Sequence, residues 1–139
     1  MIDNTRMRSE LSVYEWSMLE EWRDNWIAGN HEYLYSVRVG KGVSTEGVEP
    51  EWLAKCIKAN SRLKIDCVVY DDEKPVEIVE VKKVARLDAI GQIESYKYLI
   101  DLEYGVDVDK LILCNFASGD VKMVCEKFGI ELMEISVSK

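Results

Sequence analysis

Two acidic residues, Asp66 and Glu80, interrupt segments that are otherwise rich in isoleucine and valine. Residues 63–70 and 76–83 alternate as strands, and the polar turn at 71–75 between them predicts an antiparallel hairpin. A turn of that length sets four facing pairs: Tyr70 with Val76, Val68 with Ile78, Asp66 with Glu80, and Lys64 with Lys82. Two acids that face each other destabilise a strand pair, and a buried carboxylate needs a partner. The hairpin therefore predicts a site for a positively charged group, unless this face of the sheet is simply solvated.

A divalent cation is the partner that best suits two facing carboxylates. Mg²⁺ prefers oxygen ligands, commonly one or two carboxylates, with water and substrate phosphate in the remaining positions. Lys82 lies two residues after Glu80, and therefore on the same side of the strand. An ammonium group in that place can hold a water molecule for attack or lower its pKa. The alternative is an exposed strand, on which acids and lysines commonly alternate.

A helix over residues 89–104, capped by Asp88, follows the hairpin. Its apolar stripe consists of Ala89, Ile93, Tyr96 and Ile100. Gln92 falls inside this stripe, one turn before Tyr96, and a glutamine that faces a core needs a polar partner. The carboxylates of the preceding hairpin are the nearest supply, although a glutamine at the edge of the stripe could also be partly solvated.

Three short motifs follow one another on strand, strand and helix: Ile65-Asp66, Glu80-Val81-Lys82 and Gln92-x-x-x-Tyr96. In these motifs the sequence resembles the PD-(D/E)XK nuclease superfamily. The run DAIGQIESYKYL after EVKK looks most like the catalytic domain of NucS/EndoMS-type endonucleases and RecB-like nucleases. It is also similar to small archaeal and viral nucleases and to Holliday-junction resolvases. The resemblance covers residues 63–100 and implies a restriction-endonuclease-like fold.

The resemblance also implies roles for individual residues. Asp66 and Glu80 correspond to metal ligands, with the carbonyl group of Val81 as a third. Lys82 corresponds to the residue that positions or activates the attacking water. Gln92 and Tyr96 correspond to residues that support the site and contact the backbone of the substrate. The implied cofactor is Mg²⁺, for which Mn²⁺ is expected to substitute.

Members of the superfamily often add an acid from the first helix. Glu20 in Ser17-Met18-Leu19-Glu20 fits that pattern best, with Glu15 and Glu21 as competitors because the phase of the helix is open. Two departures stand out: Ile65 replaces the proline of the motif, and no separate DNA-binding domain of the NucS kind is expected. Substrate binding is therefore expected from this domain, a second copy of it, or a partner.

Basic residues gather on both sides of the hairpin motif. Residues 55–64 contain no acid and four basic residues: Lys55, Lys58, Arg62 and Lys64. Residues 82–86 contain Lys82, Lys83 and Arg86. A basic rim around an acidic metal site suits the cleavage of a phosphodiester, so the expected DNA contacts are Lys64, Lys83, Arg86, Tyr96 and Arg62. The alternative is that these side chains are solvated ends of helices and strands.

The composition excludes several other classes of protein. The chain has 139 residues, 47% of them apolar, which predicts one globular domain over residues 1–139. It contains neither a membrane-spanning run nor the apolar stretch of a signal peptide, so a cytoplasmic location without membrane association is expected. The net charge of −8 argues against nucleic-acid binding by bulk charge alone. One histidine and no C-x-x-C pair argue against zinc, and buried free thiols are expected at Cys67, Cys114 and Cys125.

The predicted order of elements is α-β-α-β-β-α-β-α-β, a mixed α/β sheet flanked by helices. Around the hairpin and long helix, the other expected elements are a helix over 9–28 capped by Ser9 and ended by Gly29-Asn30, a strand at 32–39, a short helix from Pro50, a strand at 110–115, a helix at 120–128 and a strand at 131–135. Trp16, Trp22 and Trp26 lie on the first helix and are expected mainly in the core, with a partner surface as the alternative.

The leading hypothesis is a Mg²⁺-dependent DNA endonuclease that hydrolyses phosphodiester bonds with an activated water. The runner-up is a catalytically silent protein of the same fold that binds nucleic acid or protein, and a third is a structural subunit. A homodimer is also predicted, because cutting two strands requires two sites and because the tryptophans, Leu99, Ile100 and Leu102 exceed a simple core stripe. The structure of the preferred DNA and the choice between endo- and exonuclease action stay open.

Overall fold

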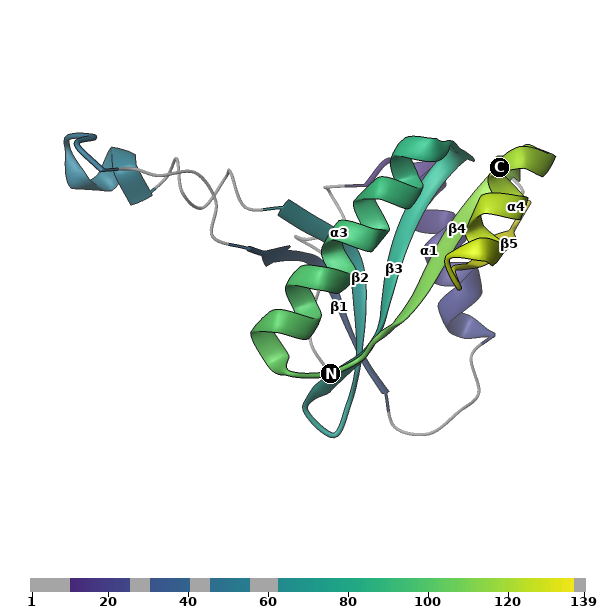
Figure 1. Ribbon diagram of the computed structural model, residues 1–139, viewed down its shortest axis with the longest axis horizontal. Coiled ribbons are helices and arrows are strands. Elements are labelled where there is room, and N and C mark those ends of the chain that lie inside the picture. Colours follow the sequence, from purple (N-terminus) through teal and green to yellow (C-terminus); the bar gives the residue numbers. More distant parts are fainter. Residues whose placement is uncertain (1–10, 26–30, 41–45, 56–62, 137–139) are drawn as a thin grey trace.

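The computed structural model describes residues 11–25, 31–40, 46–55 and 63–136 (Figure 1). In chain order the elements are α1 (Val13–Asp24), β1 (His31–Val39), β2 (Leu63–Asp71), β3 (Lys74–Ala85), α3 (Leu87–Tyr104), β4 (Asp109–Ala117), α4 (Gly119–Lys127) and β5 (Glu131–Glu134). Residues 51–55 are also helical. The predicted α/β class is confirmed, and the element order agrees with the predicted one. Within these ranges, no helix is long and apolar enough to cross a membrane.

The five strands form one mixed sheet in the order β1-β2-β3-β4-β5. β1, β2 and β3 are antiparallel neighbours, whereas β3, β4 and β5 run parallel. Parallel neighbours need crossover connections, which α3 and α4 provide. Because both crossovers are right-handed and step in the same direction, both helices cover the same face, and α1 covers the other (Figure 1).

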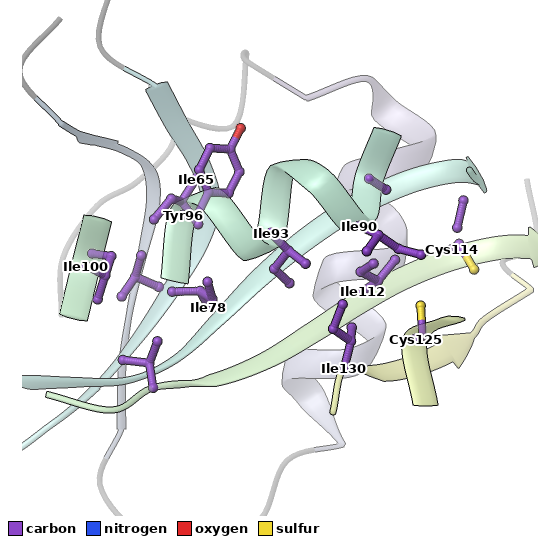
Figure 2. Packing of buried hydrophobic residues seen from close by; sticks show 14 of the residues in the cluster. Ile65, Ile78, Ile90, Ile93, Tyr96, Ile100, Ile112, Cys114, Cys125 and Ile130 are labelled. Atoms are coloured by element: carbon purple, nitrogen blue, oxygen red, sulfur yellow. The ribbon is translucent and has the colours of Figure 1, made fainter. Parts of the chain in front are cut away.

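Apolar side chains fill both faces of the sheet. On the face covered by α3 and α4, the core includes Ile65, Val68, Ile78, Ile93, Tyr96, Ile100, Ile112, Cys114 and Cys125 (Figure 2). On the α1 face it includes Met18, Leu19, Trp22, Tyr35, Cys67, Val69, Val79, Val81, Leu111 and Leu113. The predicted stripe of the long helix is thereby confirmed, as are the three buried free thiols. Trp22 is buried in the cluster under α1 and the partly buried Trp16 packs against that cluster, whereas Trp26 and Cys56 lie outside the described residues.

Two predicted helix starts were wrong by one turn or less. The cap of α1 is Ser12 and not Ser9: its hydroxyl accepts the Glu15 N–H, while the Glu15 carboxylate accepts the Ser12 N–H. This reciprocal capping box satisfies two backbone donors, which explains why the helix begins there. The cap of α3 is Arg86 and not Asp88, and Asp88 lies in the first turn, where a negative charge favours the helix dipole. α1 also ends earlier than predicted, at Asp24 with Asn25 as its cap.

The hairpin between β2 and β3 is tighter than predicted. Asp71 pairs with Lys74, so the turn has two central residues, Asp72 and Glu73, both with positive φ (52° and 66°). This geometry matches the right-handed twist of the strands better than a five-residue loop does. Tyr70 consequently pairs with Pro75 instead of Val76, and an irregularity between Val69 and Tyr70 absorbs the difference. The predicted pairing of Val68 with Ile78 is confirmed.

Glu77 on β3 is a buried acid. It is 7% exposed, and its Oε1 atom has no hydrogen-bond partner within the described part of the chain. Burial raises its pKa from 4.5 to about 7, and the charges of Glu131 and Asp109 add to the shift. The folded chain therefore holds this proton more tightly than the unfolded chain does. Stability from this group is fully present below pH 4.5 and falls as the pH rises to about 7.

We expect Glu77→Gln to raise the free energy of unfolding at pH 8 by about 2 kcal/mol, somewhat less than the full pKa shift implies because solvent screens part of the charge. At pH 3, below both pKa values, the variant and the wild type should be equally stable, since Glu77 is then protonated in the folded and the unfolded chain. Urea denaturation at both pH values measures the difference. Glu126→Gln on exposed α4 is the matched control and should change neither value. Parallel stability curves for Glu77→Gln and the wild type would contradict this account.

Candidate functional site

Asp66 of β2 and Glu80 of β3 lie in direct contact. Their carboxyl groups are hydrogen-bonded to each other, and Asp66 Oδ2 accepts the Val81 N–H at 2.8 Å. Val68 pairs with Ile78 and Cys67 with Val79, and one further step in that register places Asp66 opposite Glu80. Glu80 is only 3% exposed. The structure therefore brings together two acids in a largely desolvated place.

A local rotation of β1 and β2 accompanies this contact. Residues two apart in a regular strand share a face, yet Ile65 packs on the face of α3 whereas Cys67 packs on the face of α1. On β1, Val37 and Tyr35 divide between the same two faces. Between them lies Ser36, with a φ of 52° that non-glycine residues rarely adopt.

Asp66 lies between Ile65 and Cys67, at the point where the face changes. The paired residues of β2 and β3 reach as far as Cys67 and Val79, and beyond them the side chain of Asp66 binds the Val81 N–H. A side-chain carboxylate here satisfies a backbone donor of the neighbouring strand, which otherwise needs a ladder partner. The acid is thus part of the sheet as well as part of the site.

Burial raises the pKa of both Asp66 and Glu80. The hydrogen bond and the negative charge of Asp66 raise the pKa of Glu80 further, whereas the Glu80 hydrogen bond and the Val81 N–H favour ionised Asp66. Two carboxyl groups this close ionise as a pair and share one proton near neutral pH. A cation that binds between them must displace that proton.

Lys82 and Tyr96 adjoin the carboxyl pair. The positive charge of Lys82 lowers the pKa of both acids, so its ammonium group lies in the neighbourhood of the pair. Burial raises the pKa of Tyr96, and the charges of Glu80 and Asp66 raise it further. Figure 2 shows the Tyr96 ring beside Ile65, with its phenol oxygen at the edge of the apolar cluster. The hairpin and α3 thus place Asp66, Glu80, Lys82 and Tyr96 close to one another.

Gln92 lies one turn before Tyr96 on α3 and is half-buried. Its Oε1 atom is buried and has no hydrogen-bond partner among the described residues. A buried carbonyl oxygen without a donor or cation costs free energy, so this atom is suited to a ligand that the folded chain alone does not supply.

Of the three glutamates considered on α1, the structure brings Glu15 toward the site. The negative charge of Glu15 raises the pKa of Asp66, and its Oε1 atom accepts the Ser12 N–H at 3.0 Å. Glu20 instead lies 3.9 Å from the Arg23 guanidinium, and Glu21 is exposed. The sequence left the phase of this helix open. In the structure Met18, Leu19 and Trp22 are buried, and this fixes the phase and places Glu15 on the same side of the helix one turn earlier.

The basic residues expected at the DNA are distributed unevenly. Lys64 is half-buried on β2, and Arg86 is exposed at the start of α3. Lys83 is exposed, and its Nζ atom lies 5.1 Å from the centre of the Tyr14 ring, a cation–π contact. Arg62 and Lys58 lie outside the described residues. Lys82, Lys83 and Arg86 therefore form the basic segment that the structure describes next to the acids.

The donors at this site fit a small, hard cation. They comprise the buried carboxyl group of Glu80 and the half-buried carboxyl group of Asp66, with the orphaned Gln92 oxygen on the adjoining helix. Within the described residues, no three His, Cys, Asp or Glu side chains are already grouped around a metal position. Such a set matches the coordination preference of Mg²⁺, which binds one or two carboxylates and takes water and phosphate oxygens in its other positions.

Comparison with solved structures identifies the fold. EndoMS, in a structure titled as a complex with dsDNA and in an apo structure, matches 93% of this chain with a TM-score of 0.58 and 20% identity. This chain spans about half the length of those proteins, 47% and 49% respectively. The mixed sheet with its flanking helices is thus a fold found within EndoMS.

A repair endonuclease from Pyrococcus abyssi matches 52% of this chain and 33% of its own length, with 27% identity and a TM-score of 0.46. No protein-family model matches the sequence, and no curated protein matches it significantly.

We expect Glu80→Gln to raise the free energy of unfolding at pH 8 in chelator by about 1 kcal/mol, because it removes one charge from a like-charged buried pair. Both acids have raised pKa values, so the gain should disappear at acidic pH, where the wild-type pair is protonated. Millimolar Mg²⁺ should raise the melting temperature of the wild type and leave that of the variant unchanged. Thermal unfolding with and without chelator measures both effects; equal Mg²⁺ stabilisation of the two proteins would show that the cation binds elsewhere.

Proposed function

We propose that this chain is a metal-dependent DNA endonuclease of the PD-(D/E)XK superfamily. The observation that carries the proposal is the contact between Asp66 and Glu80, with Lys82 beside them. Nothing in the folding of a hairpin requires two buried acids to touch, and their repulsion costs stability. The contact between the two acids is explained if they bind a cation that in turn contacts a phosphodiester.

In this proposal Asp66, Glu80 and the carbonyl group of Val81 hold Mg²⁺, for which Mn²⁺ can substitute. The bound cation supplies charge stabilisation for the phosphoryl oxygens and the leaving group. Lys82 holds the attacking water in line with the phosphorus atom and favours loss of its proton. Gln92 uses its orphaned oxygen to orient a ligand of the site, and Tyr96 closes the apolar side.

DNA as the substrate rests on the fold and on local charge. One matched structure is titled as a complex of EndoMS with dsDNA. The net charge of −8 opposes a phosphate backbone at long range. Exposed charges act over only about 8–10 Å at physiological salt, so Lys82, Lys83 and Arg86 set the potential at the site.

The second candidate is a protein of the same fold that binds nucleic acid or protein without cleaving it. The observation in its favour is that, among the residues that the structure describes, only two carboxylates make direct contact at the site, while Glu15 is occupied in the capping box of α1. DNA binding without cleavage under any divalent cation separates this candidate from the first.

A homodimer stays a prediction, supported less by the tryptophans than the sequence suggested. Trp22 is buried and Trp16 packs in the same core, so neither is available as a partner surface. Leu102 is exposed on α3, whereas Ile100 is buried.

We expect Asp66→Ala, Glu80→Ala and Lys82→Ala each to lower the rate of DNA cleavage by at least about 100-fold, because each removes a group that holds the cation or the attacking water. Far-UV circular dichroism and thermal unfolding should show intact folds. Mg²⁺ or Mn²⁺ should support cleavage, whereas Ca²⁺, which accepts longer and looser coordination, should support binding with little cleavage. Lys74→Ala in the distant β-turn is the matched lysine control. Wild-type turnover in any of the three variants at saturating Mg²⁺ would contradict the proposed site residues. Full activity in excess chelator would contradict the metal dependence.

We expect Glu15→Gln to raise the Mg²⁺ concentration needed for half-maximal cleavage by about tenfold, because it removes a negative charge near Asp66. Glutamine still accepts the Ser12 N–H, so the capping box and the stability of α1 should be retained. Glu20→Gln tests the competing assignment on the same helix. A larger increase in the required Mg²⁺ concentration with Glu20→Gln than with Glu15→Gln would show that Glu20, and not Glu15, is the third acid of the site.

A further inference from the structure

Two exposed apolar side chains lie side by side where β3 and β4 end. Val84 and Phe116 are paired in the parallel register of these strands, and they are 41% and 55% exposed. Directly opposed residues on neighbouring strands leave the sheet on the same side, so the two side chains form one apolar surface. The pair that follows, Ala85 with Ala117, is buried.

This surface adjoins the candidate site. Lys82 pairs with Cys114, so Phe116 lies two residues farther along the neighbouring strand. That offset amounts to about 7 Å along the strands and about 4.8 Å across them. The carboxyl ends of parallel strands are also where ligands of α/β sheets usually bind.

The surroundings of Phe116 favour a polyanion that also carries flat apolar groups. Lys82, Lys83 and Arg86 stand around Val84 on the same stretch of chain, and Lys83 and Arg86 are exposed. A cationic rim attracts phosphates, and an exposed aromatic ring offers a face on which a base can stack. A protein partner with an acidic surface could match the rim but has no general need for the ring.

We propose that Phe116 stacks on a nucleobase next to the scissile phosphate, with Val84 completing the apolar contact. The inference rests on the proposed nuclease function and goes beyond it, because it assigns a base contact on β4 in addition to phosphate contacts on β3. The base can come from a single strand or from a nucleotide that leaves the stack of a duplex. Stacking tolerates any base sequence, so Phe116 contributes affinity and position without selecting a sequence.

The test measures DNA binding in Ca²⁺ by fluorescence anisotropy, with a labelled single strand and with the duplex of the same sequence as probes. Phe116→Ala should weaken binding by about tenfold, and Phe116→Leu, which stays apolar but cannot stack, should lose nearly as much. Phe116→Trp should retain wild-type affinity. The salt dependence of binding should be unchanged in all three, since no charge is altered. A 2-aminopurine base placed beside the cut should be quenched by the wild type and not by Phe116→Ala.

The sequence offers a closely matched control, because its other phenylalanine, Phe128, is similarly exposed at 51%. Phe128 follows α4, and its carbonyl oxygen accepts a hydrogen bond from Lys110 Nζ at 2.6 Å, so it lies near the start of β4, away from the site. Phe128→Ala should bind both probes as the wild type does. Loss confined to the single strand identifies that source of the base, and equal loss on the duplex identifies an unstacked duplex nucleotide.

Wild-type affinity in Phe116→Ala on both probes, or full retention in Phe116→Leu, would overturn the stacking role while leaving the nuclease proposal intact. If the wild type neither binds nor cleaves DNA, the nuclease proposal fails first and the stacking role fails with it.

Discussion

The contact between the Asp66 and Glu80 carboxyl groups is the constraint on which the candidate site depends. Both acids are taken out of water, and their mutual repulsion is relieved by a shared proton, by the charge of Lys82 and by the Val81 N–H. Each of these is a partial compensation, because a proton neutralises only one carboxylate and Lys82 is itself half-buried. A cation between the acids would complete the compensation and stabilise the contact between the two carboxyl groups.

The sheet accommodates these acids at a local cost. The faces of β1 and β2 exchange at Ser36 and Asp66, and Ser36 adopts a positive φ to allow it. Strained backbone of this kind costs of order 1–3 kcal/mol and persists only where surrounding structure holds it. Apolar clusters on both faces provide that support, so the packing of α1 and α3 against the sheet fixes the distance between two groups that repel each other.

The local distribution of charge matters more for the candidate site than the net charge of the chain. The net charge is −8, yet the segment from Lys82 to Arg86 contributes three positive charges beside the carboxyl pair and no acid. Since screening confines exposed charges to about 8–10 Å, a polyanion at this end of the sheet meets the basic segment, while the acidic residues of the β2–β3 turn, Asp71, Asp72 and Glu73, lie at the other end. The exposed Val84–Phe116 surface lies within the same basic region.

The sequence alone determined the α/β class, the order of the elements, the stripe of α3 and the facing of Asp66 and Glu80, because strand alternation and helical spacing are local properties that side-chain type records directly. Tertiary structure decided the rest. The two-residue turn shifted the pairing at Tyr70 but not at Val68, because an irregularity between them absorbed the change. The burial of Met18, Leu19 and Trp22 set the phase of α1 and brought Glu15, rather than Glu20, toward Asp66. Phe116 belongs to none of the motifs in the sequence, and its position beside Val84 follows only from the register of β4 against β3. The two residues are 32 positions apart and become neighbours only when the parallel crossover is formed.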